Sequence, residues 1–332
     1  MIDAWHATAV ALAFLVGLAG TWVIVRSGWR WAVDLPNERS LHVQPTPRMG
    51  GLALLAGVAA GLASAAMAEF ALPLQAFGLA VVLAGVSLAD DRAGLPIVLR
   101  LAAHMLAAGL IAAWLLGEAA PWWQMLPAVL AIAAFTNFFN FMDGANGLAG
   151  GMAAAGFSTY GVASMSTAPG FAAACFSIAA AACAFLVFNL RGRIFMGDSG
   201  SVPLGFLAGA LGLEGVLAGR WPAWFPFVVF APFVVDATLT LVRRMLRREP
   251  FWQAHREHYY QRLVRSGFSH ARLAALEYAL MAVCAGGALA ARAAAAPVRN
   301  AILATIGVLL AAAVLAVDRR WRAHPHRSPP PT

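Results

Sequence analysis

The chain has 332 residues, of which 61% are hydrophobic and only 11% are charged. A soluble globular domain has roughly 45–50% apolar and about 25% charged residues, and the mean hydropathy here is +0.73. Apolar runs of about 20 residues fill nearly the whole length, which is more than one buried core accounts for. The composition therefore excludes a soluble enzyme and predicts an all-α, polytopic transmembrane helical bundle.

The basic residues narrow the chemistry further, because all 23 of them are arginine. Without a lysine amine, Schiff-base catalysis and a Walker-type phosphate loop are excluded, whereas arginine can still bind phosphate. The net charge of +8 indicates cytoplasmic loops and anionic headgroups rather than nucleic acid. The cysteines Cys175, Cys183 and Cys284 lie inside apolar segments, so we expect small core residues and no disulfide framework.

A window of about 20 residues predicts eleven membrane spans with short connections. In chain order they cover residues 5–25, 50–68, 72–89, 97–116, 124–142, 147–166, 170–188, 202–219, 222–242, 273–293 and 298–317. Arg26 and Arg30 follow the first apolar run rather than precede it, which predicts a retained span with the N-terminus outside. We expect one integral-membrane domain over 1–317 and a basic, Pro-rich cytoplasmic tail over 318–332.

Arginine placement tests this topology independently. Eleven spans from an outside start put residues 26–49, 90–96, 143–146, 189–201 and 243–272, and the C-terminus, on the cytoplasmic side. All of the 23 arginines except Arg220, Arg292 and Arg299 then fall on that side, as the positive-inside rule requires. The sequence therefore predicts a multi-pass membrane protein with its C-terminus in the cytoplasm.

Polar side chains near the hydrocarbon region are functional candidates, because they cost free energy unless they are paired. Asp90 and Asp91 end the third span, where adjacent carboxylates can hold a cation or divide into a base and a stabiliser; a solvated helix end is the simpler reading. In NFFNFMDGANGLAGG, Asn137, Asn140 and Asp143 are three residues apart, so they share one helical face. Helix packing explains the glycines there but not the polar side chains.

Two more clusters follow. In RGRIFMGDSGS, Asp198 stands at a turn that opens a helix, where free N–H groups and a carboxylate suit an anion with Mg²⁺, and Phe195 can stack on a base or simply pack. The longest inner loop holds eight arginines together with His255 and His258. A zinc pair is one alternative, but no further ligand has a finger-like spacing. Phosphate contact by histidine and arginine is the better interpretation.

All four clusters fall on the same side of the membrane in a topology built only from hydropathy and charge, together with the loop LPNERSLHVQPTPRMGG that carries Arg48. The predicted site is cytoplasmic, acidic at its centre, basic at its rim and open to the bilayer. Such a site suits a metal-bound nucleotide diphosphate that meets a lipid phosphate.

The motifs in this order resemble those of the polyprenyl-phosphate N-acetylhexosamine-1-phosphate transferases (glycosyltransferase family 4), over roughly residues 30–275. PNERSLHVQPTPRMGG and HREHYYQRL are most similar to the bacterial branch that initiates O-antigen or other surface polysaccharides. The resemblance implies that undecaprenyl phosphate attacks the β-phosphorus of a UDP-N-acetyl sugar, giving undecaprenyl-diphospho-sugar and UMP.

The resemblance also implies roles for individual residues. Asp90 and Asp91 would be the catalytic pair that orients or deprotonates the lipid phosphate, and Asp198 with Asn140 would hold Mg²⁺, for which Mn²⁺ can substitute. The residues expected to bind substrate are Arg48, Asn137, Asp143, Asn146, Phe195, His255, Arg256 and His258. Among them, Phe195 and Asn146 would contact uracil, and the two histidines with Arg256 would bind the sugar phosphate and close the site. Arg48 would line its entrance.

Three positions depart from the family pattern or lack a clear role. Many relatives have DGxDG where this chain has DGANG, so uracil recognition would fall to an amide. Many carry a basic residue where Val98 stands, and Arg100 is the expected substitute in lipid-phosphate binding. Asp236 matches an aspartate of the family. The alternative is that it only forms an ion pair with Arg243, two helical turns later.

A transporter or flippase is the main rival, since buried carboxylates and broken helices also mark ion pathways. It predicts polar residues near the bilayer midplane and an internal repeat, and the sequence shows neither. The expected partners are thus a UDP-N-acetyl sugar, undecaprenyl phosphate and the bilayer. The sequence is compatible with GlcNAc, QuiNAc, FucNAc and GalNAc as donor sugars, and with a homodimer as well as a monomer.

Overall fold

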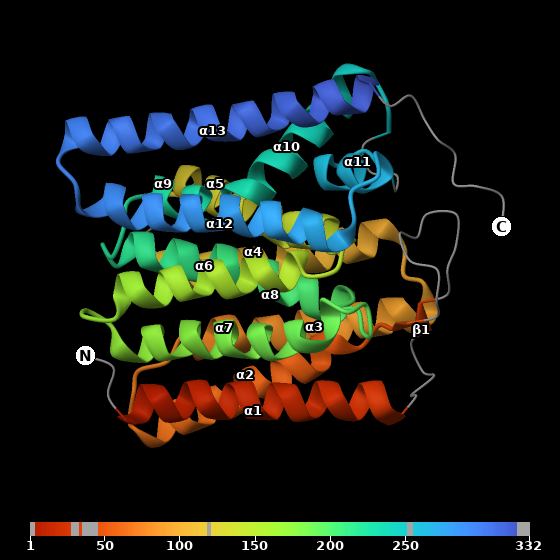
Figure 1. The fold of residues 1–332 in the computed structure, drawn as a ribbon. Coiled ribbons are helices and arrows are strands. Elements are labelled where there is room, and N and C mark those ends of the chain that lie inside the picture. The colour runs from red at the N-terminus through yellow and green to blue at the C-terminus, as the bar shows by residue number, and fades with distance from the viewer. Residues whose placement is uncertain (1–3, 28–32, 35–45, 118–120, 251–254, 324–332) are drawn as a thin grey trace.

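The computed structural model describes residues 4–27, 33–34, 46–117, 121–250 and 255–323 (Figure 1). The elements are α1 (Ala4–Ser27), β1 (Val33–Asp34), β2 (Thr46–Pro47), α2 (Gly50–Met67), α3 (Leu74–Ala93), α4 (Ile97–Leu116), α5 (Trp122–Met142), α6 (Leu148–Ser164), α7 (Pro169–Asn189), α8 (Asp198–Leu217), α9 (Trp224–Val229), α10 (Ala231–Leu246), α11 (Tyr259–Arg265), α12 (His270–Ala293) and α13 (Ala296–Ala323). The two short strands pair antiparallel, with Val33 opposite Pro47. The predicted all-α membrane bundle is confirmed.

The structure departs from the prediction of eleven spans with short connections at two of the spans. Within the described residues, nine helices are long and apolar enough to cross a bilayer: α1 to α5, α7, α8, α12 and α13. The predicted span 147–166 is α6, which has only 17 residues. The predicted span 222–242 is broken into α9 and α10 at Phe230. Pro232 lies in the first turn of α10 and has no N–H to continue the hydrogen-bond ladder of α9.

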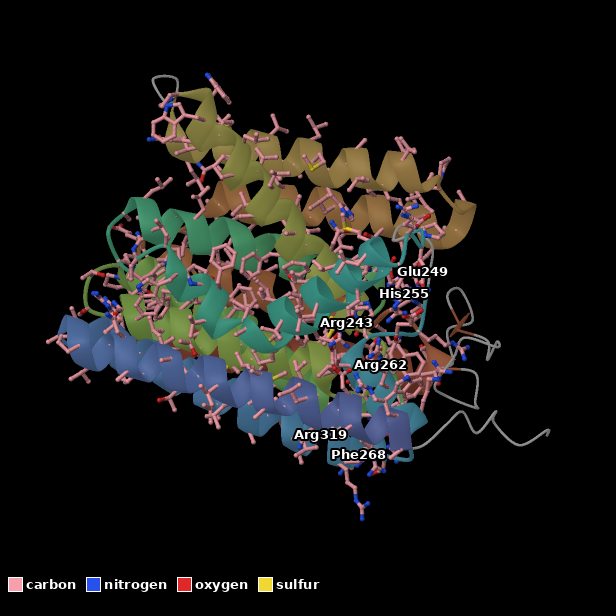
Figure 2. The ribbon with its side chains drawn as sticks, turned by 90° about the horizontal axis from the view of Figure 1, so that it is seen from above. Arg243, Glu249, His255, Arg262, Phe268 and Arg319 are labelled. Carbon is pink, nitrogen blue, oxygen red and sulfur yellow. The ribbon has the colours of Figure 1, made fainter. Side chains whose placement is uncertain are left out.

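The long helices lie side by side, and the chain turns alternately at the two ends of the bundle (Figure 1). The β1 strand, α11 and the end of α13 at Ala323 lie at one end, which we call the site end, and the start of α1 at Ala4 lies at the other. Figure 2 shows Arg243, His255 and Arg262 at the site end as well. Successive long helices therefore run in alternating directions through the bundle, as the hydropathy analysis predicted. That the site end faces the cytoplasm stays a prediction.

The centre of the bundle is formed by α7 and α8, whose most apolar stretches are 67% and 78% buried, whereas that of α13 is only 6% buried. A side chain at Gly51 would meet the backbone of Gly200, so glycine is required where α2 crosses the start of α8. This contact brings the Arg48 segment against the Asp198 turn. All three cysteines are free thiols; Cys175 and Cys284 are buried, as expected of core residues, whereas Cys183 is exposed.

The C-terminal helix α13 continues to Ala323, beyond the predicted tail boundary at residue 317. Asp318 explains the continuation, because its carboxylate accepts hydrogen bonds from Arg243 at 2.8 and 2.7 Å and from Arg262 at 3.2 Å. The first residues of the predicted tail are thus an ordered helical end attached to α10 and α11. Residues 324–332 of that tail lie outside the described residues.

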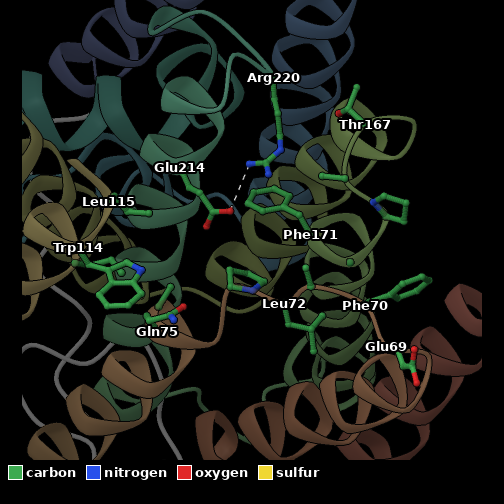
Figure 3. Close-up of a pocket in the computed structure, with 17 residues that line it drawn as sticks. Glu69, Phe70, Leu72, Gln75, Trp114, Leu115, Thr167, Phe171, Glu214 and Arg220 are labelled. Atoms are coloured by element: carbon green, nitrogen blue, oxygen red, sulfur yellow. Dashed lines mark hydrogen bonds and ion pairs between the residues drawn. The ribbon is translucent and has the colours of Figure 1, made fainter. Parts of the chain in front are cut away.

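The opposite end of the bundle contains a cavity of about 540 Å³ between the α2–α3 connection, α4, α7 and α8. Figure 3 shows Glu214 and Arg220 in its wall, joined by an ion pair of 3.4 Å. The Arg220 guanidinium also lies 4.4 Å from the centre of the Phe171 ring. These two contacts explain why Arg220 is one of the few arginines predicted on the outer side: it neutralises a carboxylate within the bundle.

Candidate active site

Acidic and basic side chains from four segments meet at the site end. Asp90 and Asp91 come from the last turn of α3, Asp198 opens α8, Arg100 lies in the first turn of α4, and Arg48 follows β2. Arg48 donates a 2.6 Å hydrogen bond to Asp198 and lies 3.7 Å from Asp91. Arg100 contacts Asp90 at 2.8 Å and reaches to 3.9 Å from Asp198. We call these five residues the acid–arginine centre.

The path of the chain around α3 and α4 fixes Asp90. Helix α3 ends at Gly94 in the left-handed conformation, with φ of 64°, which glycine adopts without a steric penalty. The turn aims the Leu95 N–H at one Asp90 oxygen at 2.7 Å, while Arg100 contacts the other. Both oxygens of Asp90 are therefore engaged, which favours an orienting role over that of a free base. Val98 is 79% exposed on the outer face of α4, and Arg100 is the basic residue that turns inward.

Backbone hydrogen bonds place Arg48 beside Asp198. The Phe195 N–H donates to the Pro47 carbonyl at 2.8 Å, and the Phe195 carbonyl accepts from the Gly50 N–H at 3.0 Å. Gly197 then takes φ of 73° and ψ of 168° immediately before Asp198, a conformation that is essentially restricted to glycine. The Phe195 side chain is half-buried in this connection. Arg48, predicted at the entrance, thus lies at the acid–arginine centre.

The polar face of α5 points into the same region, as its spacing predicted. The Asn140 amide donates to Ser201 of α8 at 3.4 Å, and Asn137 donates to its own helix at the Ala133 carbonyl. Burial raises the pKa of the Asp143 carboxyl well above its ordinary value. The charge of Arg48 opposes this increase and that of Asp198 adds to it. Asp143 therefore belongs to the same electrostatic unit as Asp198.

The DGANG turn is held by residues distant in the sequence. The Gly147 N–H donates to the Asn189 side chain at 2.7 Å, and Tyr278 donates to the Gly147 carbonyl at 2.9 Å. The Asn146 N–H donates to His270 at 3.3 Å. Because these bonds use the backbone of Asn146, its side-chain amide is the group left to recognise a ligand.

Helix α11 is anchored to α10 by Asp236, which is 6% exposed. One carboxylate oxygen lies 3.0 Å from both the His258 ring nitrogen Nδ1 and the Tyr259 N–H, and the other accepts the Tyr260 N–H at 3.0 Å. These N–H groups open α11 and have no partner within it. Pairing of Asp236 with Arg243 is therefore wrong, since Arg243 binds Asp318 instead.

The His255–His258 segment lies next to this anchor. The two imidazole rings are 4.9 Å apart, and His258 also stacks with Tyr260. The Tyr260 hydroxyl donates to the Phe141 carbonyl at 3.1 Å, which joins α11 to the end of α5. Burial lowers the pKa of His255 to about 4, and the adjacent His258 adds to the effect. His255 is thus neutral at physiological pH. Arg256 accepts a hydrogen bond from Arg265 through its backbone carbonyl.

Sequence reasoning missed several residues that shape the site: His104, Asn189, Ser201, His270 and Tyr278. His104 stands alone on an apolar helix, where a histidine is usually a core residue, and the others act from segments far away in the chain. One signal was available for His104, because it lies four residues after Arg100 and so shares its helical face.

The acid–arginine centre and Asp143 together hold four carboxyl groups and two guanidinium groups. Carboxylate and amide oxygens are the ligands that Mg²⁺ prefers, and Asp198 and Asn140 supply both kinds. The Ser199 hydroxyl is buried with no hydrogen-bond partner among the described residues. The same part of the chain contains no preformed cluster of three or more His, Cys, Asp or Glu at metal-binding distances. The excess of acids and the orphaned hydroxyl fit a divalent cation that would arrive with a diphosphate.

The comparisons with known proteins agree with this geometry. Residues 73–216, from α3 to α8, match the family Glycosyl transferase family 4. The chain is 30% identical over 283 residues to the probable undecaprenyl-phosphate N-acetylglucosaminyl 1-phosphate transferase of Bacillus subtilis, covering 79% of each protein. It is 31% identical over 325 residues to the decaprenyl-phosphate N-acetylglucosaminephosphotransferase of Mycolicibacterium smegmatis, covering 83% of this chain and 79% of the relative.

A third relative is the undecaprenyl-phosphate alpha-N-acetylglucosaminyl 1-phosphate transferase of Yersinia pestis, 27% identical over 261 residues, or 71% of this chain and 70% of that protein. The apolar helical bundle is that of an integral-membrane protein, and the relatives that it matches are transferases. The chain belongs to the glycosyl transferase family 4 of polyprenyl-phosphate sugar-1-phosphate transferases.

Proposed function

We propose that this protein transfers an N-acetylhexosamine 1-phosphate, such as GlcNAc 1-phosphate or a 6-deoxy relative, from a UDP-sugar to undecaprenyl phosphate. The products are undecaprenyl-diphospho-sugar and UMP. The reaction would take place at the cytoplasmic face of a bacterial inner membrane and begin O-antigen, other surface-polysaccharide or cell-envelope glycan synthesis. The names of the relatives support this reaction over a transporter.

The acid–arginine centre is the observation that carries the proposal. Phosphoryl transfer needs in-line positioning and charge neutralisation more than covalent help. Arg48 and Arg100 bring guanidinium groups between Asp90, Asp91 and Asp198, so phosphates that enter would exchange these carboxylate contacts for their own. Neutral His255, whose ring lies 4.9 Å from that of His258, would donate or accept hydrogen bonds without adding charge.

Mg²⁺, or Mn²⁺ in its place, would be held by Asp198 and Asn140 and would neutralise charge on the diphosphate. Phe195 is positioned by its backbone bonds beside Arg48 and would stack on uracil, with the Asn146 amide reading its edge. His258 is held by Asp236 through Nδ1, so its other ring nitrogen, Nε2, would be the one that binds the sugar phosphate, and Arg256, two residues earlier in the chain, would bind it as well. Asn137 and Asp143 complete the polar wall on α5.

The test uses purified protein in lipid nanodiscs with Mg²⁺, undecaprenyl phosphate and a panel of labelled UDP-N-acetyl sugars. We expect UMP release and a labelled lipid with at least one donor. Asp198→Asn and Asp91→Asn should lower turnover at least a hundredfold, because each removes a charge from the centre. Glu69→Gln changes an exposed acid at the opposite end and is the control. Full turnover in both aspartate variants would refute the assignment.

A further inference from the structure

His104 is a buried polar group that the proposed reaction has not yet used. It is 8% exposed, and its Nδ1 atom has no hydrogen-bond partner among the described residues. The Asn137 amide is a hydrogen-bond partner of the ring, and the charges of Arg100 and Asp198 act on it. A buried polar atom without a partner is destabilising, so its persistence needs an explanation.

The depth of His104 distinguishes it from the rest of the site. It lies one turn after Arg100 on α4, about 6 Å further from the site end at 1.5 Å per residue. On α5, which runs the opposite way, Asn137 lies about 9 Å further from that end than Asp143 by the same rise. His104 and Asn137 therefore form an inner polar pair, deeper in the bundle than Arg100 and Asp143 and inside helices that are apolar enough to cross the membrane.

The surroundings of α4 indicate which substrate reaches the level of His104 and Asn137. Its outer face is apolar and open, with Val98 79%, Leu106 65% and Leu110 52% exposed, so this face contacts lipid. Its inner face carries Arg100 and His104 and packs against α5 and α8. A water-soluble nucleotide sugar reaches the site from its rim, whereas a phosphate attached to a lipid chain must approach at the level of the bilayer. The inner polar pair therefore faces the substrate that comes from the membrane.

We propose that His104, through its free Nδ1, binds the phosphate monoester of the lipid acceptor together with Arg100. This inference rests on the proposed function and adds an acceptor-side residue to it. A phosphate monoester has a pKa near 6, so it carries both ionised oxygens and, in part, a hydroxyl. A neutral imidazole nitrogen matches either, since it donates as N–H or accepts as a lone pair depending on the tautomer. Asn137 keeps the ring in place from the other side.

The experiment separates acceptor binding from donor binding. In nanodiscs, His104→Leu should raise the KM for undecaprenyl phosphate at least tenfold and leave the KM for the UDP-sugar within twofold. His104→Gln keeps a polar atom at similar reach and should recover part of the loss. His6→Leu is the matched control, because His6 is also buried, at 2% exposed, but contacts the Pro169 carbonyl at the opposite end.

A binding measurement tests the inference without turnover. Farnesyl phosphate should raise the thermal midpoint of the wild type and of His6→Leu, and should raise that of His104→Leu by less than half as much. The shift with UMP should be equal in all three. An unchanged farnesyl phosphate shift, or a loss confined to the donor KM, would overturn the inference. Absence of transfer by the wild type would instead contradict the proposed function, while the farnesyl phosphate shift would still decide the role of His104.

Discussion

Replacing Asp236 with alanine should release helix α11 from the bundle. The carboxylate accepts the Tyr259 and Tyr260 N–H groups at 3.0 Å each and holds His258. Leaving a buried donor without a partner costs about 1–3 kcal/mol, so two such donors amount to about 2–6 kcal/mol for local opening of α11. At about 1.4 kcal/mol per factor of ten, amide protection should fall by roughly 30-fold to 10⁴-fold.

Hydrogen–deuterium exchange of the wild type and Asp236→Ala in nanodiscs measures this change directly in the peptide that spans residues 255–266. Asp236→Asn keeps one acceptor oxygen and should lie between the two. Glu69→Gln is the control, because Glu69 is an exposed acid at the opposite end of the bundle and its replacement should leave exchange in α11 unchanged. If Asp236→Ala lost activity while α11 kept its protection, Asp236 would act on the substrates rather than through α11.

Three further outcomes follow from the contacts described above. Asp318→Asn should destabilise the fold by about 3 kcal/mol. This value is at the lower end for a broken buried pair, because Arg262 would still have Glu257 as a partner at 3.9 Å. An unchanged denaturation midpoint would contradict the contact between α13 and the two arginines. Gly197→Ala should cost about 1–3 kcal/mol of backbone strain and lower turnover at least tenfold, since the new Cβ would lie 2.5 Å from the Arg48 carbonyl oxygen. Gly219→Ala is the control: Gly219 has a similar φ of 67° but open space around it, so turnover should be unchanged. The folded-state pKa of His255 is about 4, below its ordinary 6.5, so the stabilising contribution of His255 is complete above pH 6.5 and is lost as the pH falls toward 4. The thermal midpoint should therefore fall less steeply from pH 7 to pH 4 in His255→Gln than in the wild type. Parallel curves would refute the shift.

Hydropathy predicted where nearly every helix lies, because a spanning helix must satisfy its backbone hydrogen bonds internally and expose apolar side chains to lipid. It could not resolve the break at Phe230, since Phe230 and its neighbours are as apolar as an intact span. Pro226 and Pro232 were the available signal, and a rule that proline interrupts the ladder would have found the break.

The acids of the centre were predictable because charged residues at the ends of apolar runs stand out. Their partners were not, as the pairs Arg48–Asp198 and His258–Asp236 are 150 and 22 residues apart in the chain. Periodicity reports which residues share one helix face, and it gives no information about which helices are neighbours. The same limit led to the mistaken pairing of Asp236 with Arg243.

Helix α13 touches little protein along its apolar length, yet its last turns are attached to α10 and α11 through Asp318. A helix surrounded by lipid responds to bilayer thickness by changing its tilt. Because Asp318 attaches the end of α13 to Arg262 of α11, a change in that tilt would move α11, whose N-cap residue is His258. The thickness and composition of the membrane are in this way connected to the geometry of the site, in addition to supplying one of its substrates.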